Sequence, residues 1–149
     1  MRLSIIQPYF YPYKNYFNLI SSSDLTVILD DVQFIRRGYI HRCILNNKKK
    51  QWLTLPIEKK NIDTKINEME FKKNAQLIFN QRLQKNDLIF KHLKNDKNFS
   101  QALKINDQNL LKYLIKNIKY CCSILDIKFN YIYSSEIRNK YGKKESLII

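Results

Sequence analysis

Two adjacent aspartates, Asp30 and Asp31, are the side chains of this sequence best placed for acid–base chemistry. They follow residues 25–29 (LTVIL), an apolar run that is typical of a buried strand. A carboxylate at a strand end can act as a general base, hold a cation or bind the hydroxyl groups of a sugar. Because successive side chains of a strand point to opposite faces, we expect only one of the two to enter a site.

Three arginines follow the aspartates, namely Arg36, Arg37 and Arg42. The planar guanidinium group presents a fork of donors that matches phosphate, whereas a lysine ammonium acts as a point charge. Residues 29–42 therefore form either a site for a phosphorylated ligand or a solvated basic loop whose acids balance the arginines.

His41 lies in the same segment and could act as a general acid or base, because a histidine ordinarily titrates near neutrality. Cys43, two residues further on, would share its face of a strand, so a Cys–His couple is conceivable. No third group that would orient this couple is identified. The other histidine, His92, falls late in a predicted helix, where we expect a surface or capping role.

Residues 7–17 (QPYFYPYKNYF) combine two prolines with several aromatic rings, which indicates a stiff loop. Such a loop could stack a sugar or a base, with Gln7 supplying both a hydrogen-bond donor and an acceptor. We expect most of these rings to cover the core, and Tyr9, next to a strand end, to contact a ligand. Trp52, the one tryptophan, is expected either in the core or as a platform on which a sugar stacks.

Several common site motifs are absent. Gly38 and Gly142 are the only glycines, so neither a P-loop nor a G-x-G-x-x-G turn can be built. H-E-x-x-H and G-x-S-x-G are missing as well. The three cysteines include no C-x-x-C pair, so the sequence predicts neither a disulfide framework nor a metal site. No cofactor is predicted.

The residues before Asp30 predict the unit that positions these groups. Residues 3–7 (LSIIQ) and 25–29 read as buried strands, and residues 14–22 read as a short helix between them. Strand, helix and strand in so few residues indicate a βαβ unit with parallel strands and a right-handed crossover. Ligands of such sheets bind beyond the carboxyl ends of the strands, where Gln7–Pro8 and Asp30–Asp31 fall.

The rest of the chain predicts a hairpin followed by helices. The fold class is therefore α/β, with an N-terminal βαβ unit in a mostly parallel sheet, a β-hairpin, and a helical segment that returns to a strand. We expect one domain over residues 1–149, and Asp107 as the N-cap of the clearest helix. The expected elements are hairpin strands at 39–45 and 51–57, a further strand at 62–71, helices at 72–93 and 107–125, a strand at 128–133 and a last polar helix.

Charge and hydropathy limit the partners. The net charge of +14 admits polyanions, but its excess is mostly lysine in a chain rich in Asn and Ile, as an AT-rich coding sequence would produce. No nucleic-acid-binding signature is present, so nucleic acid is an unlikely partner. No apolar run is long enough to span a bilayer, and no signal peptide is recognised, so the cytoplasm is expected.

Three segments, in this order and spacing, resemble the N-terminal signature of the WbqC-like family: QPYFYPYKNYFNLISSSD, VILDDVQFIRRGYIHR and QWLTLPI. The family is associated with bacterial O-antigen and surface-polysaccharide loci. The resemblance implies a transferase acting on an amino-sugar intermediate, by acyl or aminoacyl transfer, with a phosphorylated or nucleotide-linked sugar as partner. The resemblance itself assigns no catalytic residue. From residue type and position, we expect Asp30, Asp31 and His41 in catalysis and Gln7, Tyr9, the three arginines and Trp52 in substrate binding.

The chain departs from the family pattern at several positions. Asn15 stands where a glycine is expected, and His41–Arg42–Cys43 stands where an Asn-Arg-Asn-like element is typical, which weakens a His41–Cys43 mechanism. Members commonly exceed 200 residues, and this chain ends on SLII, so we expect it to lack a C-terminal part.

Two alternatives stay open at the level of sequence. A βαβ start with ligand groups at the first strand end also fits nucleotidyl transferases of the HIGH type, although the histidine pair is missing. The charge alone would fit a basic nucleic-acid-binding module. The sequence leaves the oligomeric state open.

Overall fold

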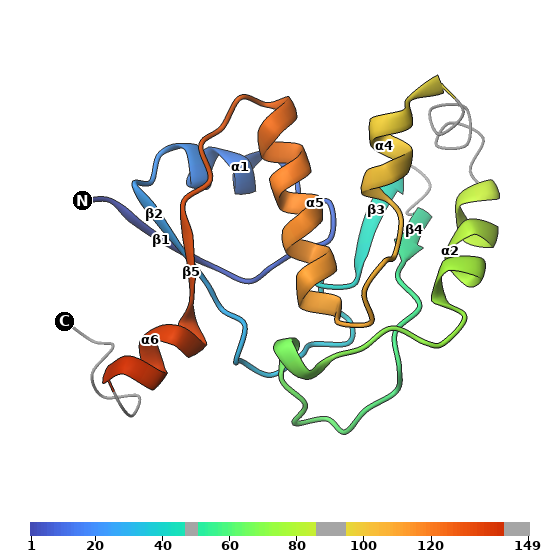
Figure 1. The fold of residues 1–149 in the computed structure, drawn as a ribbon, viewed down its shortest axis with the longest axis horizontal. Helices are drawn as coiled ribbons and strands as arrows, with labels where there is room; N and C mark the ends of the chain where they lie inside the picture. The colour runs from blue at the N-terminus through green and yellow to red at the C-terminus, as the bar shows by residue number, and fades with distance from the viewer. Residues whose placement is uncertain (47–50, 86–94, 142–149) are drawn as a thin grey trace.

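A computed structural model describes residues 1–46, 51–85 and 95–141 (Figure 1). One side of the molecule is a three-stranded parallel sheet in the order β1-β2-β5, formed by Leu3–Ile6, Leu25–Ile28 and Tyr131–Tyr133. A separate antiparallel hairpin consists of β3 (Arg42–Asn46) and β4 (Gln51–Thr54). In the view of Figure 1, helix α5 stands between the sheet and the hairpin. The predicted α/β class is confirmed.

The predicted βαβ connection forms, with helix α1 (Lys14–Ser21) joining the parallel strands β1 and β2. The prediction that β1 is buried is wrong, because Leu3 and Ile5 are exposed and only the other face of the strand is covered. Tyr16, Phe17 and Ile20 of α1 are buried in the core, at the three- and four-residue steps that place side chains on one helix face. Leu19 is half exposed and lies off that face. The unit brings the ends of β1 and β2 to the same edge of the sheet, because parallel strands run in one direction.

Helix α5 (Leu110–Ile124) is the long amphipathic helix that the sequence predicts, but its N-cap differs. The side chain of Asn109 caps it by accepting the backbone N–H of Lys112 at 3.1 Å. Asp107 instead accepts the N–H of Asn109 at 2.8 Å, outside the helix. The prediction of Asp107 as N-cap is therefore wrong by two residues, because Asp107 forms a turn just before the helix and Asn109 caps it.

The predicted strand at 62–71 is wrong. The segment contains a short 3-10 helix, η1 (Ile66–Glu68), and only isolated bridges to Gln33, Ile57 and Asn109. Ile66, Met69 and Phe71 are buried, so the burial does not follow the two-residue alternation of a half-buried strand.

The remaining helices are α2 (Ala75–Gln84), α4 (Lys97–Ala102) and α6 (Ser134–Tyr141). Helix α2 falls within the predicted helix at 72–93, the sequence does not predict α4, and α6 is the predicted last polar helix. The second half of the predicted helix at 72–93, with His92, lies outside the described residues. Among the described helices, none is both long and apolar enough to cross a bilayer.

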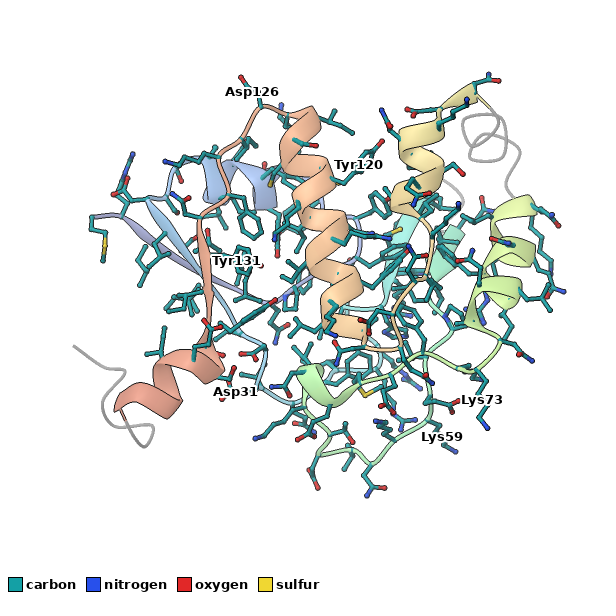
Figure 2. All side chains as sticks on the ribbon, in the orientation of Figure 1. Asp31, Lys59, Lys73, Tyr120, Asp126 and Tyr131 are labelled. Atoms are coloured by element: carbon teal, nitrogen blue, oxygen red, sulfur yellow. The ribbon has the colours of Figure 1, made fainter. Side chains whose placement is uncertain are left out.

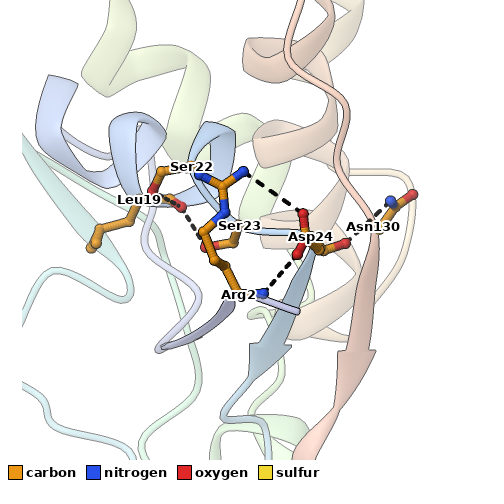
Figure 3. A network of polar contacts seen from close by, with 6 residues as sticks. All are labelled: Arg2, Leu19, Ser22, Ser23, Asp24 and Asn130. Carbon is orange, nitrogen blue, oxygen red and sulfur yellow. Dashed lines mark hydrogen bonds and ion pairs between the residues drawn. The ribbon is translucent and has the colours of Figure 1, made fainter.

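Asp24, just before β2, links the amino-terminal ends of the three strands (Figure 3). Its carboxylate accepts the backbone N–H of Arg2 at 2.6 Å, and the Arg2 guanidinium lies 3.8 Å away. The backbone carbonyl of Asp24 accepts the side-chain amide of Asn130 at 3.4 Å. All three strands are thus linked at this exposed edge, which leaves the opposite, carboxyl-terminal edge for a site.

Candidate functional site

The carboxyl edge of the parallel sheet gathers a carboxylate cluster, which we define as Asp30, Asp31, Ser134, Ser135 and Asn67. The two aspartates follow β2, and the two serines follow β5 as the first residues of α6. Figure 2 shows Asp31 beside the junction of β5 and α6. The cluster joins residues 104 apart in the chain.

Asp30 is only 3% exposed and binds the first turn of α6. Its carboxylate accepts the backbone N–H of Ser135 at 2.9 Å, the Ser135 hydroxyl at 2.6 Å and the Asn67 amide at 3.1 Å. Burial alone would raise the pKa of Asp30, but these hydrogen bonds and that of Ser134 outweigh it and lower the pKa. Asp30 is therefore an ionised anchor at a helix N-terminus, where negative charge is favoured.

Both aspartates approach the same hydroxyl group. Ser134 Oγ lies 2.6 Å from Asp31 Oδ1 and 3.0 Å from Asp30 Oδ1, and it accepts the backbone N–H of Asp30 at 3.2 Å. The expectation that the two side chains diverge is wrong, because β2 ends at Ile28 and the strand alternation no longer applies two residues later. Since a hydroxyl carries one proton, the shorter distance favours donation to Asp31.

A second group, which we call the ring row, consists of Tyr9, Tyr39 and Trp52. The ring centroids of Tyr9 and Tyr39 are 5.8 Å apart, and those of Tyr39 and Trp52 are 5.7 Å apart. Tyr39 is 43% exposed and Trp52 is 38% exposed. Of the two alternatives for Trp52, the structure therefore favours a surface platform over a core position.

Tyr9 and Tyr39 of the ring row line a cavity of about 400 Å³, which we call the outer cavity. The backbone N–H of Phe10 donates to the carbonyl of Tyr39 at 3.1 Å, so the loop after β1 is fixed against the segment that precedes β3. A predominantly aromatic cavity of this size is typical of small-molecule sites. Its walls are formed by Tyr9, Phe10, Tyr11, Pro12, Tyr13, Tyr39, Cys43 and Ile44.

The three arginines have different surroundings. Arg42 lies 4.2 Å above the Trp52 ring, and its guanidinium donates to the carbonyls of Gly38, at 3.1 Å, and Arg37. Arg36 donates to the carbonyl of Lys60. Arg37 is exposed, and its side chain forms no hydrogen bond within the described part of the chain. Arg37 is thus the guanidinium fork that a ligand can most readily use.

Gln7 lies half-buried at the end of β1, and its backbone carbonyl accepts the Tyr16 hydroxyl at 2.9 Å. It stands where the loop leaves the sheet for the ring row. The hydrogen bonds of Asp30 stay within the carboxylate cluster, and the ring contacts of Tyr39 stay within the ring row. The structure therefore divides the predicted site residues into two groups connected by this loop.

His41 is buried, with 8% of its surface exposed and its ring 5.2 Å from that of Phe34. Burial, and then the positive charges of Arg42 and Arg82, lower its pKa to about 4. The expectation that His41 titrates near neutrality is therefore wrong. The sequence does not reveal that the imidazole is enclosed. Burial also raises the pKa of Cys43 to about 12, so no thiolate forms there at neutral pH. A role for His41 in catalysis stays a prediction.

Sequence reasoning missed Tyr39, Ser134, Ser135 and Asn67 as members of these groups. The pair Ser134–Ser135 follows a predicted strand end, which was the available signal, whereas nothing local points from Asn67 to Asp30. No group of metal-ligating side chains is present in the described ranges.

Comparison with known proteins gives one family. The model of the WbqC-like protein family matches residues 7–149. An uncharacterized protein of Mycobacterium tuberculosis (strain ATCC 25618 / H37Rv), Rv1507c, is 33% identical over 60 residues, which cover 40% of this chain and 26% of that protein. No solved structure matches the chain at a significant level. Because the family model covers nearly the whole sequence, this chain belongs to the WbqC-like protein family.

Proposed function

We propose that this protein is a transferase of surface-polysaccharide biosynthesis that binds a phosphorylated or nucleotide-linked amino sugar in the outer cavity. The observation that carries the proposal is that Tyr9 and Tyr39 line a cavity of about 400 Å³, with the Trp52 ring 5.7 Å from that of Tyr39. Sugars and bases present flat faces that stack on exposed aromatic rings, which hold them with little loss of side-chain entropy.

Three polar residues that flank the cavity-lining segments in sequence bind the rest of the ligand. Arg37 holds the phosphate through its guanidinium fork. Arg42 acts as a positioning residue, because it covers Trp52 and binds the turn that carries Arg37. Gln7, at the point where the loop leaves the sheet, orients the sugar hydroxyls.

We assign the role of general base to Asp31 and that of anchor to Asp30. The Asp30 oxygens are occupied by Ser135 and Asn67, and its lowered pKa makes it a weaker base. Asp31 shares the Ser134 hydroxyl and follows directly on the anchored Asp30, so its position is fixed. Asp30 supports the site, and Asp31 takes the proton from the attacking group of a substrate that reaches from the outer cavity along the loop after β1 to the carboxylate cluster.

Binding can be followed through Trp52, which is the only tryptophan and belongs to the ring row. We expect UDP-N-acetylglucosamine to change its fluorescence, and Tyr39→Ala to raise the Kd about threefold to tenfold, the range of one aromatic stacking contact. Titration of wild type and variant measures the change.

Two controls make this test specific. Tyr131→Ala removes a ring from β5 that is no part of the cavity wall, and it should leave the Kd unchanged. Arg37→Ala should weaken UDP-N-acetylglucosamine much more than free N-acetylglucosamine, because only the former carries phosphate. Equal Kd values for wild type and Tyr39→Ala would exclude the outer cavity as the sugar site.

The base is tested in cells. When the only copy of the gene carries Asp31→Asn, which keeps size and removes the charge, we expect loss of the modified surface glycan on a gel. The protein level, measured by immunoblot, should stay near that of wild type. A wild-type glycan pattern from Asp31→Asn would exclude Asp31 as the base.

A further inference from the structure

A second cavity, which we call the inner cavity, shares three wall residues with the outer one and has a volume of about 260 Å³. Leu45, Leu53, Leu83 and Leu103 line it together with Phe99, and none of these residues borders the outer cavity. They come from the hairpin, from α2 and from the region of α4. An apolar cavity with such walls offers favourable burial to hydrocarbon and no partner to a charged or hydroxylated group.

Tyr11, Cys43 and Ile44 line both cavities and form their shared wall. Tyr11 has a φ of 44°, in the left-handed region that is unfavourable for a residue with a large side chain. Its ring is held between Phe10, at 5.0 Å, and Phe99, at 6.3 Å. Residues held in such conformations by their surroundings cluster at active sites and ligand clamps.

The shared wall has little polarity of its own. The Tyr11 hydroxyl is buried and has no hydrogen-bond partner among the described residues. The Cys43 thiol stays protonated at neutral pH, because burial raises its pKa to about 12. A ligand that occupies both cavities therefore contacts a small thiol, an aliphatic side chain and one hydroxyl without a partner at their shared wall. This setting suits an amide group that joins a polar half of the ligand to an apolar half.

We propose that the two cavities together bind an N-acylated amino sugar, with its ring in the outer cavity and its acyl chain in the inner cavity. The inference rests on the proposed function, which it deepens by specifying the acyl group as a linear hydrocarbon chain longer than acetyl. The ring row selects the flat sugar or base, and the volume of the inner cavity limits the length of the acyl chain.

The test is a series of UDP-N-acylglucosamines with acetyl, butanoyl, hexanoyl and octanoyl chains, titrated by calorimetry. We expect the affinity to rise by up to about fourfold for each added methylene that enters the inner cavity, and to level off once the cavity is full. An affinity that is flat or falls from acetyl onward would overturn the inference. That result would leave the proposed function intact, provided that the acetyl compound still binds.

Two variants locate the chain. Leu45→Phe, at a half-buried position of β3, fills part of the inner cavity and should shorten the longest chain that still gains affinity, with little change for acetyl. Leu83→Phe, at a buried position of α2, should do the same from the opposite wall, with its folding checked by urea denaturation. If the affinity depended on acyl-chain length in both folded variants as it does in wild type, the acyl chain would bind elsewhere and the inference would be contradicted.

Discussion

Acidification from neutral pH to about pH 4 should destabilise the protein by about 3 kcal/mol through His41 alone. The folded state protonates this imidazole only near its pKa of about 4, whereas the ordinary value is 6.5. Between these two pH values the unfolded chain holds more protons than the folded protein, so protonation favours unfolding. The contribution is fully present above the unfolded pKa and is lost as pH falls toward the folded pKa.

The measurement is the free energy of unfolding in urea at several pH values, for wild type and His41→Gln. Glutamine keeps a polar side chain and does not titrate, so the slope between pH 4 and 6.5 should become flatter. His92→Gln removes the other histidine and serves as the matched control. A slope that disappears in His92→Gln and persists in His41→Gln would contradict the assignment. An NMR titration of His41 with a midpoint near neutrality would contradict the burial itself.

The sequence predicts the βαβ unit because each of its strands is marked by a short apolar run and by the residue that ends it. Residues 3–7 end at Pro8, residues 25–29 end at Asp30, and each run is apolar and short. Alternation in residues 128–133 also predicts β5. Its place beside β2 depends on pairing between distant parts of the chain, such as Thr26 with Tyr131, which no local pattern encodes.

The same distinction explains the site. Asp30 is identified by its position after a strand, but its bonds to Ser135 and Asn67 join three separate segments, and they determine that it is an anchor. His41 looks like an acid–base residue until the structure places Phe34 against it. Residue type and spacing predict where chemistry can occur, whereas burial and partners decide which groups are chemically competent.

Replacement of Asp30 by alanine should lower the free energy of unfolding by about 2–4 kcal/mol. The change removes the acceptor of the Ser135 N–H and hydroxyl and of the Asn67 amide, and leaves these donors without their partner. It also removes the negative charge at the start of α6. Because the pKa of Asp30 is lowered, its contribution is present above the unfolded pKa and lost as pH falls through the folded pKa. Urea denaturation at neutral pH measures the loss.

Asp24→Ala is the matched control. Asp24 directly precedes β2 of the same sheet, and its carboxylate also accepts a backbone N–H, that of Arg2. Its side chain is 51% exposed, so this change should cost less than about 1 kcal/mol. A double-mutant cycle of Asp30→Ala with Ser135→Ala should show a coupling of about 1–3 kcal/mol, as for hydrogen-bonded neighbours. Equal effects of Asp24→Ala and Asp30→Ala, or a cycle without coupling, would mean that the carboxylate cluster does not hold α6 against the sheet. The base proposed at Asp31 depends on that anchor, because its position follows from the residue before it.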